Sequence, residues 1–193
     1  MRADARRNRE RILAAAEVVF ADKGPSASTE DVAATAGVAI GTVFRHFPTK
    51  QALLQAILKD LLLRLTKETD RLATEEDPAT ALFTFLLHTV EQAAQQRGVV
   101  DLLAESGVAV QVADSVQALR QGIDELLTRS RGAGAVREDI GVDEVIALLT
   151  ALCQGALRAG WDRDLRHRTV AIVLDGLRPP AHRLASGKQP APQ

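Results

Sequence analysis

The stretch that decides the fold reads AATAGVAIGTVFRHF over residues 33–47. Its pattern predicts a short helix, a turn at Gly37 and a second short helix, because glycine readily takes the left-handed conformation that ends one helix and redirects the chain. Ser28 precedes the first of these helices and Asp31 follows three positions later, a spacing that predicts a weak capping box. We therefore expect two helices joined by a tight turn.

The second helix of this pair combines small residues on its outer side with two aromatic rings. Gly41 and Thr42 allow close approach to another surface, and Phe44 and Phe47, three positions apart, are expected to anchor the helix. The major groove of DNA admits a helix of this kind. The stretch therefore predicts a helix-turn-helix unit that reads DNA.

Residues 37–47, with Lys50 and the amphipathic segment before them, resemble the N-terminal domain of the tetracycline-repressor (TetR) family of transcription regulators. The motif covers roughly the first quarter of the chain. The rest is similar to the family only in length and helical pattern. The resemblance implies a homodimeric repressor that binds a palindromic DNA operator and releases it when a small-molecule effector binds the larger C-terminal domain.

Two residues depart from the family pattern. Ala39 stands where the family usually has Ser or a similar cap, a change that weakens the helix by about 1 kcal/mol. Phe44 stands where the family usually has Tyr, so one phosphate contact is lost and the ring is left to pack or to touch a thymine methyl. The glycine turn and the hydrophobic positions are intact, so these departures bear on operator affinity.

The resemblance maps DNA contact onto Thr42, Phe44, Arg45, His46 and Lys50. Arg45 either reads a guanine edge or binds phosphate or solvent. His46 either donates to phosphate, as the family pattern favours, or bonds a nearby carbonyl. Lys50, which follows the capping residue Thr49, either clamps phosphate or is exposed without a partner. Ile40 either reads a thymine methyl or packs against the first helix of the unit.

The composition is that of a folded globular chain, with 46% hydrophobic and 25% charged residues among 193. A formal net charge of −1 argues against a protein that coats nucleic acid by charge alone. Residues 1–50, however, carry eight positive and six negative side chains. The arginines gathered at the start form either a flexible arm that reaches a minor groove or phosphates, or a solvated helix turn.

The chain has one cysteine, Cys153, so an intramolecular disulfide is impossible and a reducing cytoplasm is indicated. The first residues lead directly into a charged amphipathic helix, which predicts that no signal peptide is present. No apolar stretch approaches the length that crosses a bilayer. We therefore expect a cytoplasmic protein with no membrane partner.

Apolar residues recur at helical spacing along the chain and no strand pattern persists, so the predicted fold class is all-α. Helices are expected over about 6–22, 50–72, 78–97, 99–105, 109–129, 142–159 and 165–177. The predicted domains are a DNA-binding domain at 1–48 and a ligand-binding and dimerisation domain at 49–178. Residues 179–193 are expected to form a disordered tail.

The last two predicted helices are apolar on more than one side, which requires burial on two faces. One of these faces is predicted to be a second subunit, giving a four-helix interface across a twofold axis. The TetR family places its dimer contact there. The alternative is that both helices belong to a single core.

An effector pocket is expected between the helix that follows Pro48 and the three helices after it. With five Phe, one Trp and no Tyr, it is expected to be mainly aliphatic, with at most one of Phe83 and Phe85 lining it. The candidate polar lining residues are His88, Glu91, Glu105, Gln111, Gln117, Gln154 and Trp161. Each has a surface position or a satisfied core hydrogen bond as its alternative. Glu91 or Glu105, if it points inward, favours a cationic effector.

The sequence indicates no enzyme, metal site or bound cofactor. Its four histidines are scattered and match no metal or catalytic spacing: His46, His88, His167 and His182. A second class stays open, a helical adaptor that binds another protein through its apolar last helices. The repressor and the adaptor differ in DNA affinity. The affinity of a repressor falls steeply as the salt concentration rises, whereas the adaptor has no salt-sensitive DNA affinity.

Overall fold

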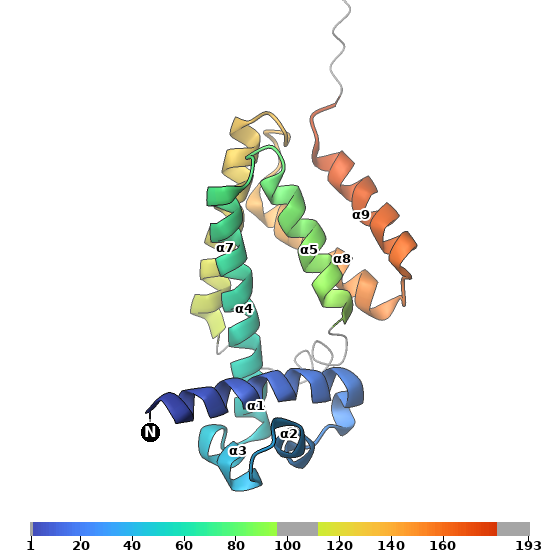
Figure 1. The fold of residues 1–193 in the computed structure, drawn as a ribbon. Coiled ribbons are helices and arrows are strands. Elements are labelled where there is room, and N and C mark those ends of the chain that lie inside the picture. The colour runs from blue at the N-terminus through green and yellow to red at the C-terminus, as the bar shows by residue number, and fades with distance from the viewer. Residues whose placement is uncertain (1, 96–111, 181–193) are drawn as a thin grey trace, which may run out of the picture.

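The computed structural model describes residues 2–95 and 112–180. In these ranges the chain forms eight α-helices, one short 3-10 helix and no strand, which confirms the all-α fold class. Figure 1 shows helices α1, α2 and α3 gathered with the start of α4 at one end of the molecule. From there α4 runs into a second group of helices, with α9 on its outer side (Figure 1).

The first group is formed by α1 (Arg2–Lys23), the 3-10 turn (Gly24–Ser26), α2 (Thr29–Ala36) and α3 (Ile40–His46). Helix α1 begins earlier than the sequence predicted, so the N-terminal arginines lie on a helix and not in an extended arm. Two ion pairs at helical spacing stabilise this first part of α1: Arg7 with Asp4, and Arg6 with Glu10. The alternative of a solvated helix turn is therefore the one observed.

The second group is formed by α4 (Lys50–Glu75), α5 (Ala81–Gln95), α7 (Ala113–Gly132), α8 (Val142–Arg158) and α9 (Arg163–Leu177). Helix α5 begins three residues after Pro78. The residues before it form a turn, because the Asp77 carboxylate accepts a hydrogen bond from the backbone N–H of Ala79 at 2.9 Å. Helix α7 runs to Gly132, although the sequence predicted that it ends at residue 129, before Ser130. That side chain is fully buried and its hydroxyl donates to the carbonyl of Pro78 at 2.8 Å. The expected helix over 99–105 and residues 181–193 lie outside the described residues.

Each group has its own hydrophobic core. The first core is built around Ile12, Phe20, Val32 and Val43 and also takes in Leu53, Leu54 and Ile57 of α4. The packing of the first group therefore continues past residue 48, where the sequence placed the domain boundary. Because α4 runs on from this core into the second group, it connects the two.

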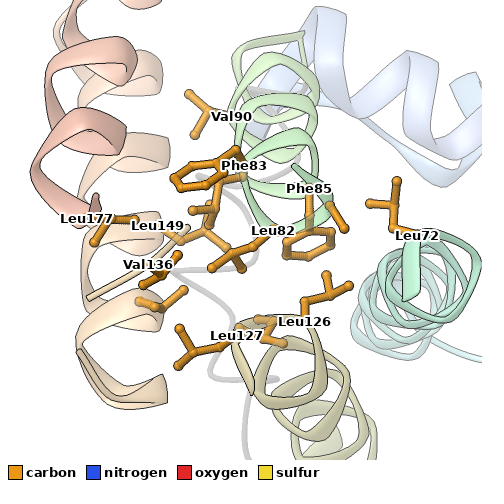
Figure 2. Packing of buried hydrophobic residues seen from close by; sticks show 14 of the residues in the cluster. Leu72, Leu82, Phe83, Phe85, Val90, Leu126, Leu127, Val136, Leu149 and Leu177 are labelled. Carbon is orange, nitrogen blue, oxygen red and sulfur yellow. The ribbon is translucent and has the colours of Figure 1, made fainter. Parts of the chain in front are cut away.

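The second core gathers buried side chains from α4, α5, α7, α8 and α9. Figure 2 shows Phe85 on the side of α5 that faces Leu72 of α4, and Phe83 on the side that faces Leu149 of α8. Both rings are buried, at 0% and 7% exposure. Both phenylalanines therefore belong to the core. Within the described ranges, none of the helices has the length and apolar character needed to cross a membrane.

Candidate nucleic-acid interface and effector cavity

The turn between α2 and α3 is formed by short-range contacts that the sequence predicted. The Ser28 hydroxyl accepts from the backbone N–H of Asp31 at 3.1 Å, and the Asp31 carboxylate accepts from the N–H of Ser28 at 3.1 Å, which is a complete capping box. Hydrogen bonds from Lys23 and Ser28 lower the pKa of Asp31 to about 2, so the cap is ionised at neutral pH. Gly37 has a φ of 62° and ends α2 in the left-handed conformation.

A long-range contact also fixes the end of α2. The guanidinium of Arg11 in α1 donates to the carbonyl of Ala36 at 2.6 Å. The last carbonyls of a helix have no partner within the helix, and a cation there is favoured by the helix dipole. Arg11 therefore joins α1 to the turn that sets the direction of α3, a role that the sequence analysis did not assign to it.

Helix α3 is held by one face and leaves the other open. Val43 and Phe47 are buried at 0% and 4% exposure, and the guanidinium of Arg9 lies 5.4 Å from the centre of the Phe47 ring. Phe44 is 43% exposed and Ile40 is 37% exposed. The expectation that both rings anchor α3 was therefore wrong for Phe44, whose ring lies on the open face with Ile40 because the two residues are one helical turn apart.

The other predicted contact residues of α3 lie close to this open face. Arg45 is exposed, and Thr42 and His46 are half-buried. Gly41 has nothing within 4 Å of the position that a Cβ would occupy. The residue before the helix, Ala39, provides no side-chain cap, as the sequence predicted. The result is a short helix whose outer surface offers an aromatic ring, an aliphatic chain and a guanidinium.

Lys50 lies at the start of α4, which is capped by the Thr49 hydroxyl as predicted. Its ammonium donates to the carbonyl of Ala27 at 2.8 Å and lies 5.6 Å from the centre of the Phe20 ring. Lys50 is therefore half-buried and connects α4 to the segment between α1 and α2. This structural contact was not among the alternatives that the sequence suggested for it.

An apolar cavity of about 300 Å³ lies between α4, α5 and α8. Its aliphatic lining comes from Leu61, Leu65, Ala93, Leu149 and Leu157. Thr89, Gln92, Thr150, Cys153 and Gln154 complete the lining. Burial raises the pKa of the Cys153 thiol to about 11, so this side chain behaves as a neutral, weakly polar group. The cavity is mainly aliphatic. Helix α8 lines it, whereas the expected pocket lay between the helix that follows Pro48 and the three helices after it, with Gln154 of α8 as one candidate lining residue.

The predicted polar lining residues are spread over the second group of helices. Of the predicted lining residues that the structure describes, only Gln154 lines the apolar cavity. Glu105 and Gln111 lie outside the described residues, and Gln117 is exposed on α7. His88 is exposed, with its Nδ1 3.6 Å from the carboxylate of Glu68.

Glu91 and Trp161 have structural partners at the end of the domain near α9. The Glu91 carboxylate lies 3.3 Å from Nε of Arg166 and 3.0 Å from Nε2 of His167, so its charge is compensated within the protein. The ring of Trp161 covers Gly155, where an added Cβ would lie 2.6 Å from the ring. This close approach explains why a glycine occupies this position near the C-terminal end of α8.

Comparison with known proteins finds a family model for each of two parts of the chain. Residues 12–57 match the family model described as "Bacterial regulatory proteins, tetR family", and residues 77–179 match "Transcriptional regulator SbtR-like, C-terminal domain". The HTH-type transcriptional regulator UidR of Escherichia coli strain K12 is 30% identical over 190 residues, which cover 92% of this chain and 93% of that protein.

Two further comparisons agree with this match. A TetR transcription regulatory protein from Mycobacterium vanbaalenii, whose crystal structure is known, is 37% identical with a TM-score of 0.75 over 92% of this chain and 99% of that one. The HTH-type transcriptional repressor Rv3405c of Mycobacterium tuberculosis is 48% identical over 69 residues, 35% of each chain. The helix-turn-helix unit, the helical second domain and these matches show that the chain belongs to the TetR family of transcriptional regulators, which are not enzymes.

Proposed function

We propose that this regulator is a homodimeric repressor that binds a palindromic operator and is released from it by a small-molecule effector. The observation that carries the proposal is the open face of α3, where Phe44 at 43% exposure and Ile40 at 37% lie next to Arg45. Two apolar side chains one helical turn apart on the exposed face of a short helix fit the thymine methyl groups in the major groove. Arg45 adds a guanidinium that pairs with guanine or phosphate.

The remaining predicted contacts take supporting roles in this proposal. Thr42 and His46 reach phosphates at the edges of the groove and thereby set the position of α3. Lys50 supplies positive charge near the backbone while its ammonium keeps the contact with Ala27. Its larger effect is to hold α4 against the DNA-binding unit.

A second subunit is proposed to pack on α8 and α9. Ile172 is 72% exposed and Leu165 is 40% exposed, and their separation of two helical turns places them on one face of α9. Val170 and Leu177 of the same helix are buried in the second core. Helix α9 therefore has one apolar face inside the subunit and another outside it, as a helix at a twofold interface does.

The effector is proposed to bind the apolar cavity, with α4 carrying the response. Leu61 and Leu65 of α4 line the cavity, and Leu53 and Ile57 of the same helix lie in the first core. A ligand that fits only a shifted position of α4 changes the separation of the two α3 helices from the roughly 34 Å that successive major grooves require. Switching occupancy from nearly complete to nearly absent requires a preference of about 5 kcal/mol for the shifted state.

The proposal is tested by selecting bound sequences from a random duplex pool and titrating the best one at two salt concentrations. We expect an inverted repeat whose affinity falls as salt rises. Arg45→Ala is expected to lower the operator affinity about tenfold or more, because it removes one good base or phosphate contact. Lys67→Ala is the matched control, because it removes an exposed cation of α4 in the second group of helices, outside the helix-turn-helix unit. No enrichment of any sequence refutes the proposal and favours the adaptor.

A further inference from the structure

A second cavity, of about 420 Å³, adjoins the apolar cavity. Leu65, Thr89 and Gln92 line both spaces. The second space, here named the polar chamber, is otherwise lined by charged and polar side chains of α1, α4 and α5: Glu17, Arg64, Glu68 and His88. The two spaces therefore form one site with an apolar half and a polar half.

Both carboxylates of the polar chamber are ion-paired and partly buried. Glu17 accepts from the guanidinium of Arg64 at 2.7 and 3.4 Å, and Glu68 accepts from that of Arg71 at 2.8 and 2.9 Å. Their side chains are 19% and 28% exposed. The hydrogen bonds from Arg71 lower the pKa of Glu68, which is therefore ionised at neutral pH.

These pairs leave the carboxylates able to bind a further donor. An ionised carboxylate has about four lone-pair positions, and each of these two uses only part of that number on its arginine. Arg64 also pairs with Asp60, and Arg71 also pairs with Glu75, so the connected ion pairs at the chamber hold four carboxylates and two guanidinium groups. This excess of negative charge attracts an added cation and repels an added anion. Both effects are stronger here than at a fully hydrated surface.

We propose that the polar chamber binds the ammonium end of a cationic amphiphile whose hydrocarbon body fills the apolar cavity. The inference rests on the proposed function, because it names the chemical class of the effector. Thr89 and Gln92, which line both halves, are placed to contact the ligand where its polar and apolar parts meet.

The position of Glu17 links this ligand to the DNA-binding unit. Glu17 belongs to α1 and Arg64 to α4, so their ion pair joins the first group of helices to the helix that lines the cavity. Arg64 also pairs with Asp60 of its own helix at 2.9 Å. An ammonium bound at a second position on Glu17 shares the charge of this carboxylate with Arg64, and Arg64 keeps its existing pair with Asp60. Binding therefore weakens the link between α1 and α4.

The experiment is a calorimetric titration of the full chain with three ligands of equal chain length: decylammonium, decanoate and decanol, each below its aggregation concentration. We expect decylammonium to bind about tenfold or more tightly than decanoate, a difference of the size that one partly buried charge contact supplies. Glu68→Gln and Glu17→Gln are each expected to reduce this preference to about threefold or less. Glu125→Gln removes an exposed carboxylate of α7 and is expected to leave the preference unchanged.

The outcomes separate this inference from the proposed function. Equal affinity for decylammonium and decanoate, or an unchanged preference in both chamber variants, overturns the cationic chamber. If Glu68→Gln does not fold, as judged by circular dichroism, Glu17→Gln decides. Operator binding without ligand is measured in parallel. A protein that binds its operator but shows no charge preference contradicts this inference alone, whereas a protein that selects no DNA contradicts the proposed function.

Discussion

Replacing Gly122 with alanine tests how closely α4 and α7 pack. A Cβ at Gly122 would lie 2.1 Å from Oγ1 and 2.9 Å from Cβ of Thr69, well inside the roughly 3.5–4.0 Å of favourable contact. Thr69 is 1% exposed, and its hydroxyl donates to the carbonyl of Thr66 at 2.7 Å. The side chain cannot turn away without losing this bond, so the helices must separate.

The expected loss of stability follows from two opposing contributions. Overpacking a close-packed site costs about 1–3 kcal/mol, and the short approach to Thr69 places Gly122→Ala in the upper half of that range. Alanine in place of glycine inside a helix increases the stability by about 1 kcal/mol. The net destabilisation is therefore about 1–2 kcal/mol. For a chain of this length it lowers the melting temperature by about 2–8 °C.

The assay is thermal unfolding followed by circular dichroism, with two comparison variants. Gly132→Ala changes a glycine of the same helix that has nothing within 4 Å of its Cβ position, so we expect a melting temperature equal to or above that of the parent. Thr69→Ala removes the hydroxyl that clashes. In the double variant we therefore expect it to recover about 1 kcal/mol relative to the sum of the single changes. A Gly122→Ala protein that melts like Gly132→Ala refutes the reasoning.

Two further predictions concern Lys50 and Cys153. Lys50→Met is expected to lower the stability by about 1 kcal/mol, because it removes a charged hydrogen bond to Ala27, in addition to weakening operator binding; a variant with the parent's melting temperature contradicts this structural role. Burial raises the pKa of Cys153 to about 11, so the folded protein at pH 8 is expected to react with iodoacetamide on the order of a hundredfold more slowly than a free thiol, with the rate rising towards pH 11. Mass spectrometry of the alkylated protein measures this rate, and rapid labelling at pH 8 would show that the thiol is exposed.

The features that the sequence predicted correctly depend on residues within a few positions of one another. The capping box of Ser28 and Asp31, the left-handed Gly37 and the Thr49 cap each satisfy backbone groups in their own turn. Such contacts form whenever the local chain adopts a helix end. For this reason the helix-turn-helix unit and the start of α4 were predictable without any knowledge of tertiary structure.

The contacts that were missed join residues far apart in the chain. Arg11 reaches Ala36, Lys50 reaches Ala27, and Glu91 pairs with Arg166. No local pattern identifies the partner of a long flexible side chain, because the partner depends on how whole helices are placed. Lys50 was therefore assigned to DNA as a basic residue, and Arg11 was counted only among the N-terminal arginines, although the structure gives each a backbone carbonyl of its own domain.

Glycines inside the predicted helices are a signal for tertiary packing that is present in the sequence. A glycine inside a helical pattern lowers the stability of the helix, so its presence indicates a packing reason. Gly122 and Gly155 are such positions, and the structure places Thr69 and Trp161 against them. Gly155 indicates in this way that a large side chain packs on α8, and the structure shows that this side chain is Trp161.

In the proposed mechanism, the placement of the two cores lets a ligand in the apolar cavity act on the first group of helices. Leu53, Leu54 and Ile57 fix the first part of α4 in the core that also holds Val43 of α3. Close-packed interiors resist compression, so a shift of α4 at Leu61 and Leu65 moves the first group as a body and is not absorbed between them. The Glu17–Arg64 pair opposes such a shift because it joins α1 to the same turn of α4. A ligand that both fills the apolar cavity and binds Glu17 therefore displaces the helix and weakens the contact that resists the displacement.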